Sequence, residues 1–212
     1  PPKAIKHSTL LHVGLPNTAT SMLQTALFPK HSQIEYLGKY IGRKRRCRDA
    51  AVEFIMRGIL TPPSKQVDLP PLNEVFERDV LGSLQPGKVP LWSSEDLTGG
   101  GPRNRKARAN NLRAVFGNCK IIVVIRHPLA FVRSMYFQRL KAAQIDQKTW
   151  PSKPGSFFEP EWWVQKNWER PHKADLSYLA YADAIEIFAK AFGEDSIGIF
   201  LFEELVENQS RF

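Results

Sequence analysis

The chain has 212 residues, of which 42% are hydrophobic and 24% are charged, and this composition is typical of one domain with a sizeable core. Its formal net charge of +9 favours an anionic partner: a nucleotide, an acidic polysaccharide, a membrane surface or nucleic acid. We find no apolar run as long as a membrane span, no visible signal peptide, and with only two cysteines no disulfide framework. We therefore expect a single domain over residues 1–212, whose site is either complete or continued beyond that stretch.

The first predicted strand, residues 10–13, leads through a polar turn into a helix. It is short, apolar and closed by Gly14, which is typical of a buried strand. Apolar residues at positions 22–27 recur at helical spacing until Pro29 ends the helix. Together the strand, the small-residue loop and the helix N-terminus predict an anion site, because the first N–H groups of a helix lack internal partners and its dipole favours negative charge.

Strands and helices alternate along the rest of the chain, which predicts an α/β fold with a central parallel sheet flanked by helices and with ligands at the carboxyl ends of the strands. The clearest strand, residues 120–125, is an unbroken β-branched run that suits a central position covered on both faces. The other predicted strands cover residues 33–37, 89–93 and 197–202, and the other predicted helices cover residues 50–60, 73–84, 107–116, 129–143 and 175–192.

Two basic clusters and two irregular segments separate these elements. Residues 43–48 and 103–108 are rich in Arg and Lys, and each is either a solvated surface or part of an anion site. Neither comes with a zinc-finger spacing or an aromatic RNA-binding signature, so nucleic-acid binding is disfavoured. We expect a flexible connection at residues 99–102 and a long aromatic loop at residues 144–173, which is either functional or poorly ordered.

The frame of the first loop narrows the class of nucleotide. Positions 14–21 have the spacing of the P-loop motif G-x-x-x-x-G-K-[ST], with Ser21 in the last place. However, Ala19 replaces the second glycine and Thr20 replaces the lysine that contacts the β- and γ-phosphates. This departure disfavours a P-loop kinase or an ordinary ATPase.

The same stretch, GLPNTATS from Gly14, resembles the G-x-P-K-T-G-T-[TS] loop that holds the 5′-phosphosulfate in sulfotransferases, with Asn17 in place of the usual lysine. A second stretch, R-x-P-x-x-x-x-x-S-x-Y, begins at Arg126, where a strand ends, and places Ser134 about two turns into the next helix. It resembles the motif with which sulfotransferases bind the 3′-phosphate of 3′-phosphoadenosine 5′-phosphosulfate (PAPS). The two motifs occur in the family order, and the resemblance runs from Leu10 to about Leu205.

The resemblance is closest to bacterial-type and carbohydrate sulfotransferases and implies a P-loop-like, three-layer fold. It implies an enzyme that moves a sulfuryl group from PAPS to a hydroxyl or amine of a carbohydrate-like acceptor, leaves 3′-phosphoadenosine 5′-phosphate (PAP) and needs no metal. A cytoplasmic location is implied by the bacterial type, or a soluble lumenal domain if the chain is trimmed. The implied nucleotide-binding residues are Pro16, Asn17, Thr18, Ala19, Thr20 and Ser21 for the 5′-phosphosulfate, and Arg126 and Ser134 for the 3′-phosphate.

An acceptor hydroxyl needs a general base, and Glu95 is the candidate. It follows the strand at residues 89–93 closely, so we expect it on the same rim of the sheet as the loop. Asp96 is an adjacent alternative, and Glu95 could instead cap a helix or pair with a surface arginine. His12 lies within the first strand and is expected to be a packed core histidine. No His and Cys cluster of metal-ligand spacing is present.

Asn17 is the second candidate catalytic position, because the lysine it replaces would stabilise charge on the bridging oxygen as the sulfur–oxygen bond breaks. Losing one such electrostatic donor typically costs about a hundredfold or more in rate. Three accounts stay open: a substitution introduced to trap a complex, another basic side chain that supplies the charge, or nucleotide binding without useful turnover. The alternative function is therefore a non-catalytic nucleotide-binding or anionic-glycan-binding protein on the same fold.

Overall fold

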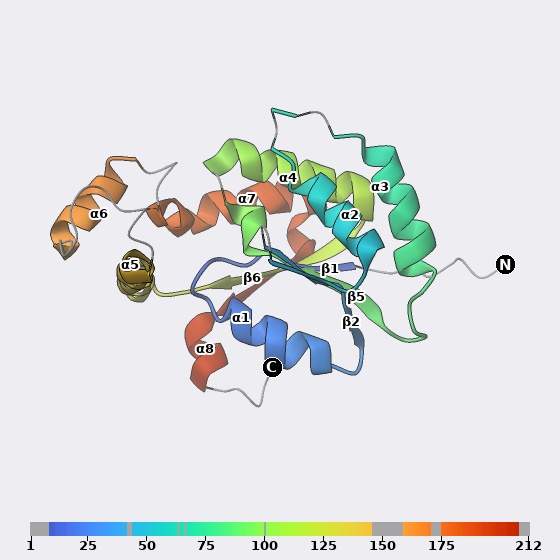
Figure 1. The fold of residues 1–212 in the computed structure, drawn as a ribbon, viewed down its shortest axis with the longest axis horizontal. Coiled ribbons are helices and arrows are strands. Elements are labelled where there is room, and N and C mark those ends of the chain that lie inside the picture. Colours follow the sequence, from blue (N-terminus) through green and yellow to red (C-terminus); the bar gives the residue numbers. More distant parts are fainter. Residues whose placement is uncertain are drawn as a thin grey trace.

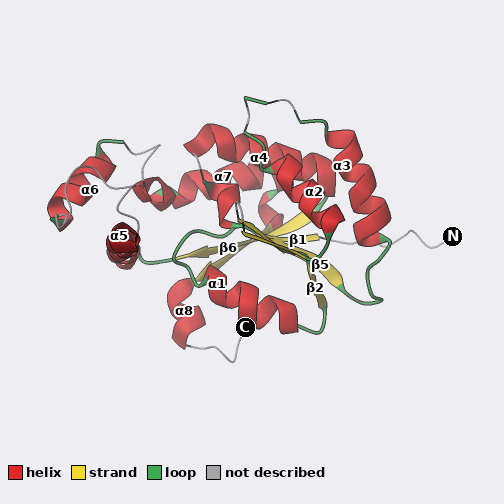
Figure 2. Cartoon of the chain, in the orientation of Figure 1, coloured by secondary structure: helices red, strands yellow, loops and turns green. Residues whose placement is uncertain are grey.

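A five-stranded parallel sheet forms the centre of the computed structural model, which describes residues 9–41, 44–62, 64–65, 67–99, 101–145, 159–170 and 175–207. Its strand order is β2-β5-β1-β6-β7, and helices cover both faces (Figures 1 and 2). This confirms the predicted α/β fold. The strands are β1 (Thr9–His12), β2 (Ile34–Tyr36), β5 (Val89–Ser93), β6 (Cys119–Ile125) and β7 (Ile197–Leu201).

The helices form two layers on the sheet (Figure 1). One face carries α2 (Ala50–Ile59), α3 (Leu69–Val75) with its continuation Phe76–Leu81, α4 (Gly101–Phe116) and α7 (Tyr181–Phe192). The opposite face carries α8 (Phe202–Glu207) and α1 (Thr20–Met22), which continues through Leu23–Leu27 and Phe28–Lys30. No helix in the described part of the chain is long and apolar enough to cross a membrane.

Successive strand residues pack alternately into two apolar cores, one on each side of the sheet. On β5, Trp92 packs in the core under α2, α3, α4 and α7, whereas Leu91 packs in the core on the side of α1 and α8. On β6, Ile121 and Val123 face the first core and Val124 faces the second. Because both faces of the sheet are covered, β6 is apolar from residue 121 to residue 125, and only Lys120 near its start is exposed.

Most predicted elements lie within a few residues of the observed ones, and α2 begins at an Asp49 cap whose side chain accepts the Val52 N–H at 2.9 Å. We predicted a flexible connection at residues 99–102, and this prediction was wrong for its last two residues. Gly101 and Pro102 form the first turn of α4, where proline is tolerated because no intrahelical partner is needed for its missing N–H. The helix predicted over residues 175–192 is interrupted near Ala180, after a 3₁₀ turn over Asp175–Leu179.

The prediction of an irregular segment at residues 144–173 was also wrong in part. α5 (Pro128–Ile145) extends to its start, and α6 (Pro160–Trp168) lies inside it. Trp163 of α6 is buried against Phe131 and Met135 of α5, so an apolar contact that local sequence does not reveal holds this helix. Residues 146–158 and 171–174 of the segment lie outside the described part of the chain.

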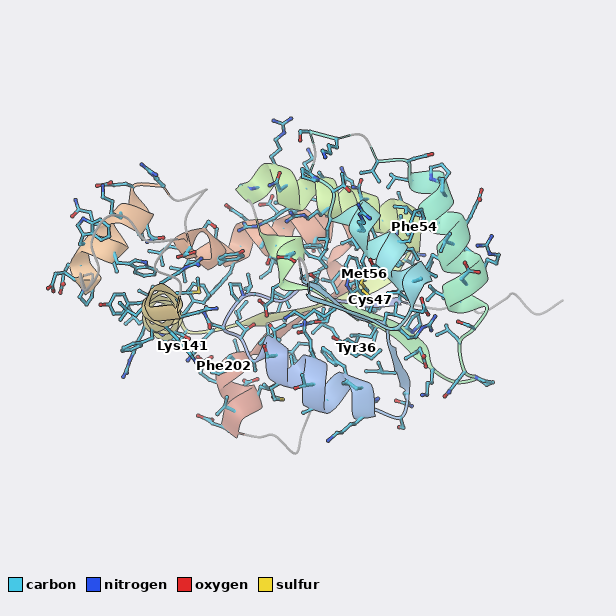
Figure 3. All side chains as sticks on the ribbon, in the orientation of Figure 1. Tyr36, Cys47, Phe54, Met56, Lys141 and Phe202 are labelled. Atoms are coloured by element: carbon cyan, nitrogen blue, oxygen red, sulfur yellow. The ribbon has the colours of Figure 1, made fainter. Side chains whose placement is uncertain are left out.

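An antiparallel hairpin follows β2 and was not predicted. It consists of β3 (Gly38–Ile41) and β4 (Lys44–Cys47), so the first basic cluster contributes a strand. Cys47 at its end lies against Met56 of α2, with 3.6 Å between the sulfur atoms (Figure 3). The hairpin starts where β2 ends, and this places β3 at the carboxyl edge of the sheet.

Candidate functional site

The loop between β1 and α1 is wound tightly by three residues in the left-handed region. Gly14, Asn17 and Ala19 have φ values of +45°, +62° and +59°. Glycine and asparagine adopt such angles readily, whereas alanine does so at a cost of about 1–2 kcal/mol. The conformation explains why loops of this kind have glycine at the position of Ala19, and it shows that this chain keeps the loop shape without it.

Two threonine hydroxyls hold the loop together from the inside. Thr18 Oγ1 donates to the Leu15 carbonyl at 2.6 Å, and Thr20 Oγ1 donates to the same oxygen at 3.2 Å. Both side chains are buried, while Ser21 is exposed at the start of α1. Thr18 and Thr20, two of the implied nucleotide-binding residues, therefore use their hydroxyls to stabilise the loop in this structure.

Asn17 joins the loop to α5. Its Nδ2 donates to Gln138 Oε1 at 2.9 Å and lies 2.7 Å from Met135 Sδ. Its backbone oxygen accepts a hydrogen bond from Arg126 Nη1 at 2.9 Å. The two anion motifs, 109 positions apart in the sequence, are thus in direct contact at Asn17 and Arg126.

Arg126 follows β6, and several contacts fix its orientation. The guanidinium carbon lies 4.4 Å from the centre of the Phe202 ring, and the Tyr181 hydroxyl donates to the Arg126 carbonyl at 2.9 Å. Its Nε is buried and has no hydrogen-bond partner among the described residues. The guanidinium therefore keeps donor capacity for an anion.

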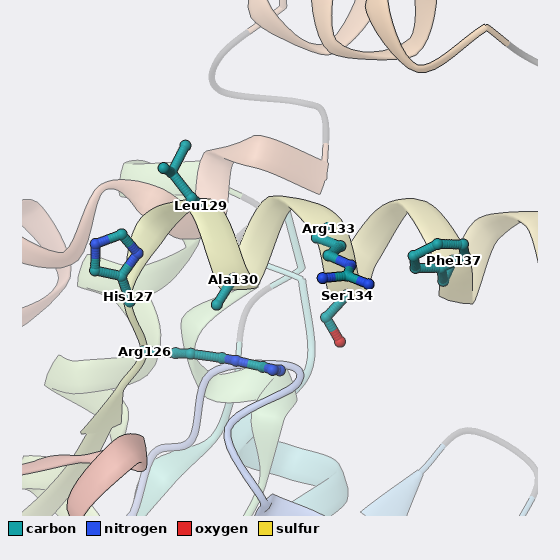
Figure 4. Close-up of a pocket in the computed structure, with 7 residues that line it drawn as sticks. All are labelled: Arg126, His127, Leu129, Ala130, Arg133, Ser134 and Phe137. Carbon is teal, nitrogen blue, oxygen red and sulfur yellow. The ribbon is translucent and has the colours of Figure 1, made fainter.

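A pocket of about 640 Å³ opens beside this arginine, under the first turns of α5. Figure 4 shows the Arg126 guanidinium and the Ser134 hydroxyl pointing into the same space. Arg133 lies beside them, and sequence reasoning missed it although it directly precedes the motif serine. The lining residues are Arg126, His127, Leu129, Ala130, Arg133, Ser134 and Phe137. Two arginines and a hydroxyl around one pocket form a suitable site for a phosphate group.

Glu95 lies on the other side of the loop, against its first residue. A Cβ atom at Gly14 would lie in ordinary contact with Glu95, 3.4 Å from its Cγ and 3.5 Å from its Cα, so it is the φ of +45° and not a lack of space that favours glycine there. The Glu95 carboxylate pairs with Lys39 Nζ of β3 at 3.6 Å. Burial raises the pKa of Glu95, and the charge of Lys39 opposes that rise.

The turn that carries Glu95 is held by buried polar contacts. Thr98 Oγ1 donates to the Gly14 carbonyl at 2.9 Å and so ties this turn to the loop. Arg105 is 1% exposed and donates to the carbonyls of Thr98 and Ser177, and Arg108 donates to the Gly99 carbonyl at 2.7 Å. In the second basic cluster, these two arginines therefore support the turn and do not form an anion-binding surface.

His12 is fully buried, as predicted, and packs beneath the site. Its Nδ1 lies 2.7 Å from Ser93 Oγ, which also accepts a hydrogen bond from Gln24 at 2.8 Å. Burial, with a smaller contribution from the charge of Lys39, lowers the pKa of His12 to about 3. The ring is therefore neutral near pH 7. No group of His, Cys, Asp and Glu residues in the described ranges is arranged to hold a metal ion.

The structure thus brings together the loop at residues 14–21, Arg126 and Ser134 on one side and Glu95 on the other. Asp96, the alternative base, is exposed. Lys39 is the functional candidate that the sequence did not suggest, because no local pattern predicts that a lysine in a basic hairpin turns toward the loop.

No protein-family profile matches the sequence, and no curated protein matches it. Among solved structures, the chain is similar to a sulfotransferase from Alicyclobacillus acidocaldarius, with a TM-score of 0.61 and 16% sequence identity. The alignment covers 96% of this chain and 76% of the other. At this identity the similarity shows that the two chains share the P-loop-like α/β fold, with its parallel sheet between helices.

Replacing Thr98 with valine tests the tie between the turn and the loop. The change removes the donor to the Gly14 carbonyl and leaves a buried oxygen without it, so we expect a loss of about 1–3 kcal/mol in the free energy of unfolding, measured by urea titration. Thr61→Val is the control, because it removes a surface hydrogen bond to Arg57 and should cost less than about 0.5 kcal/mol. Equal losses for the two variants would contradict a special role for the tie.

Proposed function

We propose that the protein is a sulfotransferase that moves a sulfuryl group from PAPS to a hydroxyl or amine of a carbohydrate-like acceptor. The observation that carries this proposal is the 2.9 Å hydrogen bond from Arg126 to the Asn17 carbonyl. It makes one site out of two motifs, each of which resembles the binding motif for one end of the same nucleotide. The shared fold adds support at the level of architecture.

In this proposal the loop holds the 5′-phosphosulfate through the backbone N–H groups of residues 18–21, at the N-terminus of the helical segment that begins with α1. The 3′-phosphate lies between Arg126 and Ser134, and Arg133 adds positive charge to the same pocket. The Asn17 carbonyl takes an N–H of Arg126 Nη1, and the guanidinium has further N–H donors for that phosphate.

The transfer then needs in-line geometry and one proton acceptor. The acceptor hydroxyl gives its proton to Glu95 as its oxygen bonds to sulfur. The bond between sulfur and the bridging oxygen breaks, and the electron pair stays on that oxygen, which becomes part of PAP. A carboxylate whose pKa is raised by burial is better matched to this task near neutral pH than an ordinary surface glutamate.

The acceptor class rests on the sequence resemblance and on α6. Trp162 and Trp168 of this helix are 44% and 72% exposed, and large aromatic faces of this kind stack on sugar rings. Transfer of ³⁵S-sulfate from PAPS to a panel of glycans tests the proposal. Labelled glycan supports an enzyme, whereas PAP binding without any transfer supports the alternative, a non-catalytic nucleotide-binding or glycan-binding protein.

One observation favours that alternative: Asn17 is neutral, and its amide is engaged with Gln138. Asn17→Lys tests how much this neutrality matters. We expect a gain in turnover of between about twofold and a hundredfold, depending on the charge that other side chains already supply, because the lysine would neutralise the leaving oxygen. Turnover is measured as PAP release with a labelled acceptor. Equal turnover of both proteins would contradict a catalytic role of charge at this position.

Arg126→Ala should weaken PAP binding by about tenfold to a hundredfold, because it removes charge-assisted hydrogen bonds to a phosphate, and Ser134→Ala should weaken it less. Calorimetry with PAP measures both. Arg103→Ala, an exposed change on α4, should leave the affinity unchanged. Tight binding of ATP in preference to PAP would contradict the assigned nucleotide.

Glu95→Gln should lower kcat by at least about a hundredfold, because the amide cannot accept the acceptor proton. In the unchanged enzyme, the raised pKa of Glu95 places the acid limb of the kcat/KM profile above pH 4.5, the ordinary value for glutamate, and activity falls as pH drops through that limb. The residual activity of Glu95→Gln should lack this limb. A limb that persists in the variant would assign it to another group.

A further inference from the structure

One lysine near the loop has no part in the function proposed above. Lys39 of β3 has a side chain that is only 15% exposed, although lysines are rarely buried unless they are paired. Its described ion-pair partner is Glu95, and the Nζ to Oε1 distance of 3.6 Å exceeds a normal hydrogen-bond length. The ammonium therefore has donors that this pair does not use fully.

The position of Lys39 is set by the backbone that surrounds it. The Leu37 N–H donates to the Leu91 carbonyl at 2.8 Å, and the Arg48 N–H donates to the Leu37 carbonyl at 2.9 Å, so the hairpin is fixed beside the carboxyl end of β5. The Lys39 ammonium faces Glu95, and Glu95 in turn lies against Gly14. Burial and, to a smaller extent, the charge of Lys39 lower the pKa of His12, whose Cε1 would lie 3.5 Å from a Cβ atom at Gly14.

The other cations near the site have different partners. Arg126 is bound to the Asn17 carbonyl and stacked on Phe202, and Arg105 and Arg108 donate to backbone carbonyls. Among the described residues, Lys39 is thus the basic side chain that pairs with Glu95, the residue in contact with Gly14.

We propose that Lys39 supplies the positive charge that the loop lacks at Asn17. This inference rests on the proposed sulfotransferase function. As the bond from sulfur to the bridging oxygen breaks, the electron pair remains on that oxygen, and the Lys39 ammonium stabilises it. The acceptor proton goes to Glu95, the partner of Lys39, so one ion pair serves both ends of the transfer.

The arrangement gives Asn17 a separate task. Its amide nitrogen donates to Gln138 of α5, the helix that carries Ser134. Positioning of the 3′-phosphate helix and neutralisation of the leaving oxygen are therefore divided between two residues.

The experiment measures release of ³⁵S-sulfate from PAPS with water as the acceptor, together with PAP binding by calorimetry. Lys39→Met should lower sulfate release by about a hundredfold, and Lys39→Arg, which keeps the charge, should retain most of the activity. Lys39→Gln repeats the charge loss with a polar end beside Glu95, in case the methionine variant does not fold. Lys88→Met is the matched control. Lys88 also pairs with a glutamate, Glu35 at 3.8 Å, but it precedes β5 at the opposite edge of the sheet. Sulfate release by Lys88→Met should equal that of the unchanged protein.

A double variant separates a catalytic charge from a structural one. When Asn17→Lys is added to Lys39→Met, sulfate release should rise at least about tenfold. Asn17→Lys alone should raise release by a smaller factor, because Lys39 and the new lysine would stabilise the same oxygen. Normal PAP binding with unchanged sulfate release in Lys39→Met and Lys39→Gln would overturn the role of Lys39, and so would a failure of Asn17→Lys to restore release. Absence of PAP binding by the unchanged protein would instead overturn the proposed function.

Discussion

The hydrogen bond between the Arg126 guanidinium and the Asn17 carbonyl is the contact on which the rest of the site depends. It joins the end of β6 to the loop after β1, which are neighbours in the sheet because of the strand order. Asn17 can present its carbonyl there because it adopts a left-handed conformation, with φ at +62°. A parallel sheet thus brings two distant motifs to one edge, and one half-buried arginine joins them.

Most of the hydrogen bonds around this contact hold the loop and the neighbouring turn in place. The loop closes on the Leu15 carbonyl through Thr18 and Thr20, and Thr98 binds the Gly14 carbonyl from the neighbouring turn. These hydrogen bonds are made within the chain itself and hold the loop in its wound shape. A site that is ordered in advance spends less binding free energy on its own organisation.

The sequence predicted the architecture well, because strands and helices depend on local patterns. Apolar runs identified the strands, and the motif spacing located Arg126 and Ser134. Glu95 was expected on the same rim of the sheet as the loop because it follows the end of a strand, and it lies there. What local patterns could not provide were the partners of buried charges: a basic stretch gives no sign that Arg105 turns inward to carbonyls or that Lys39 turns toward Glu95.

The same limit explains the missed elements. The hairpin of β3 and β4 is rich in charged residues, so it lacks the apolar alternation by which strands are recognised. α6 is held by the burial of Trp163 against α5, a contact between segments far apart in the chain. In both cases the stabilising interaction is tertiary, and the local sequence carries little information about it.

The central claim is that the loop at residues 14–21 and the pocket beside Arg126 form one nucleotide site. A crystal structure of the protein with PAP tests it most directly. We expect the 5′-phosphate to bind to the backbone N–H groups of the loop and the 3′-phosphate to lie between Arg126 and Ser134. We expect the Lys39 ammonium to lie near the 5′-phosphate. Binding of PAP elsewhere, or with its 3′-phosphate away from Arg126, would contradict it.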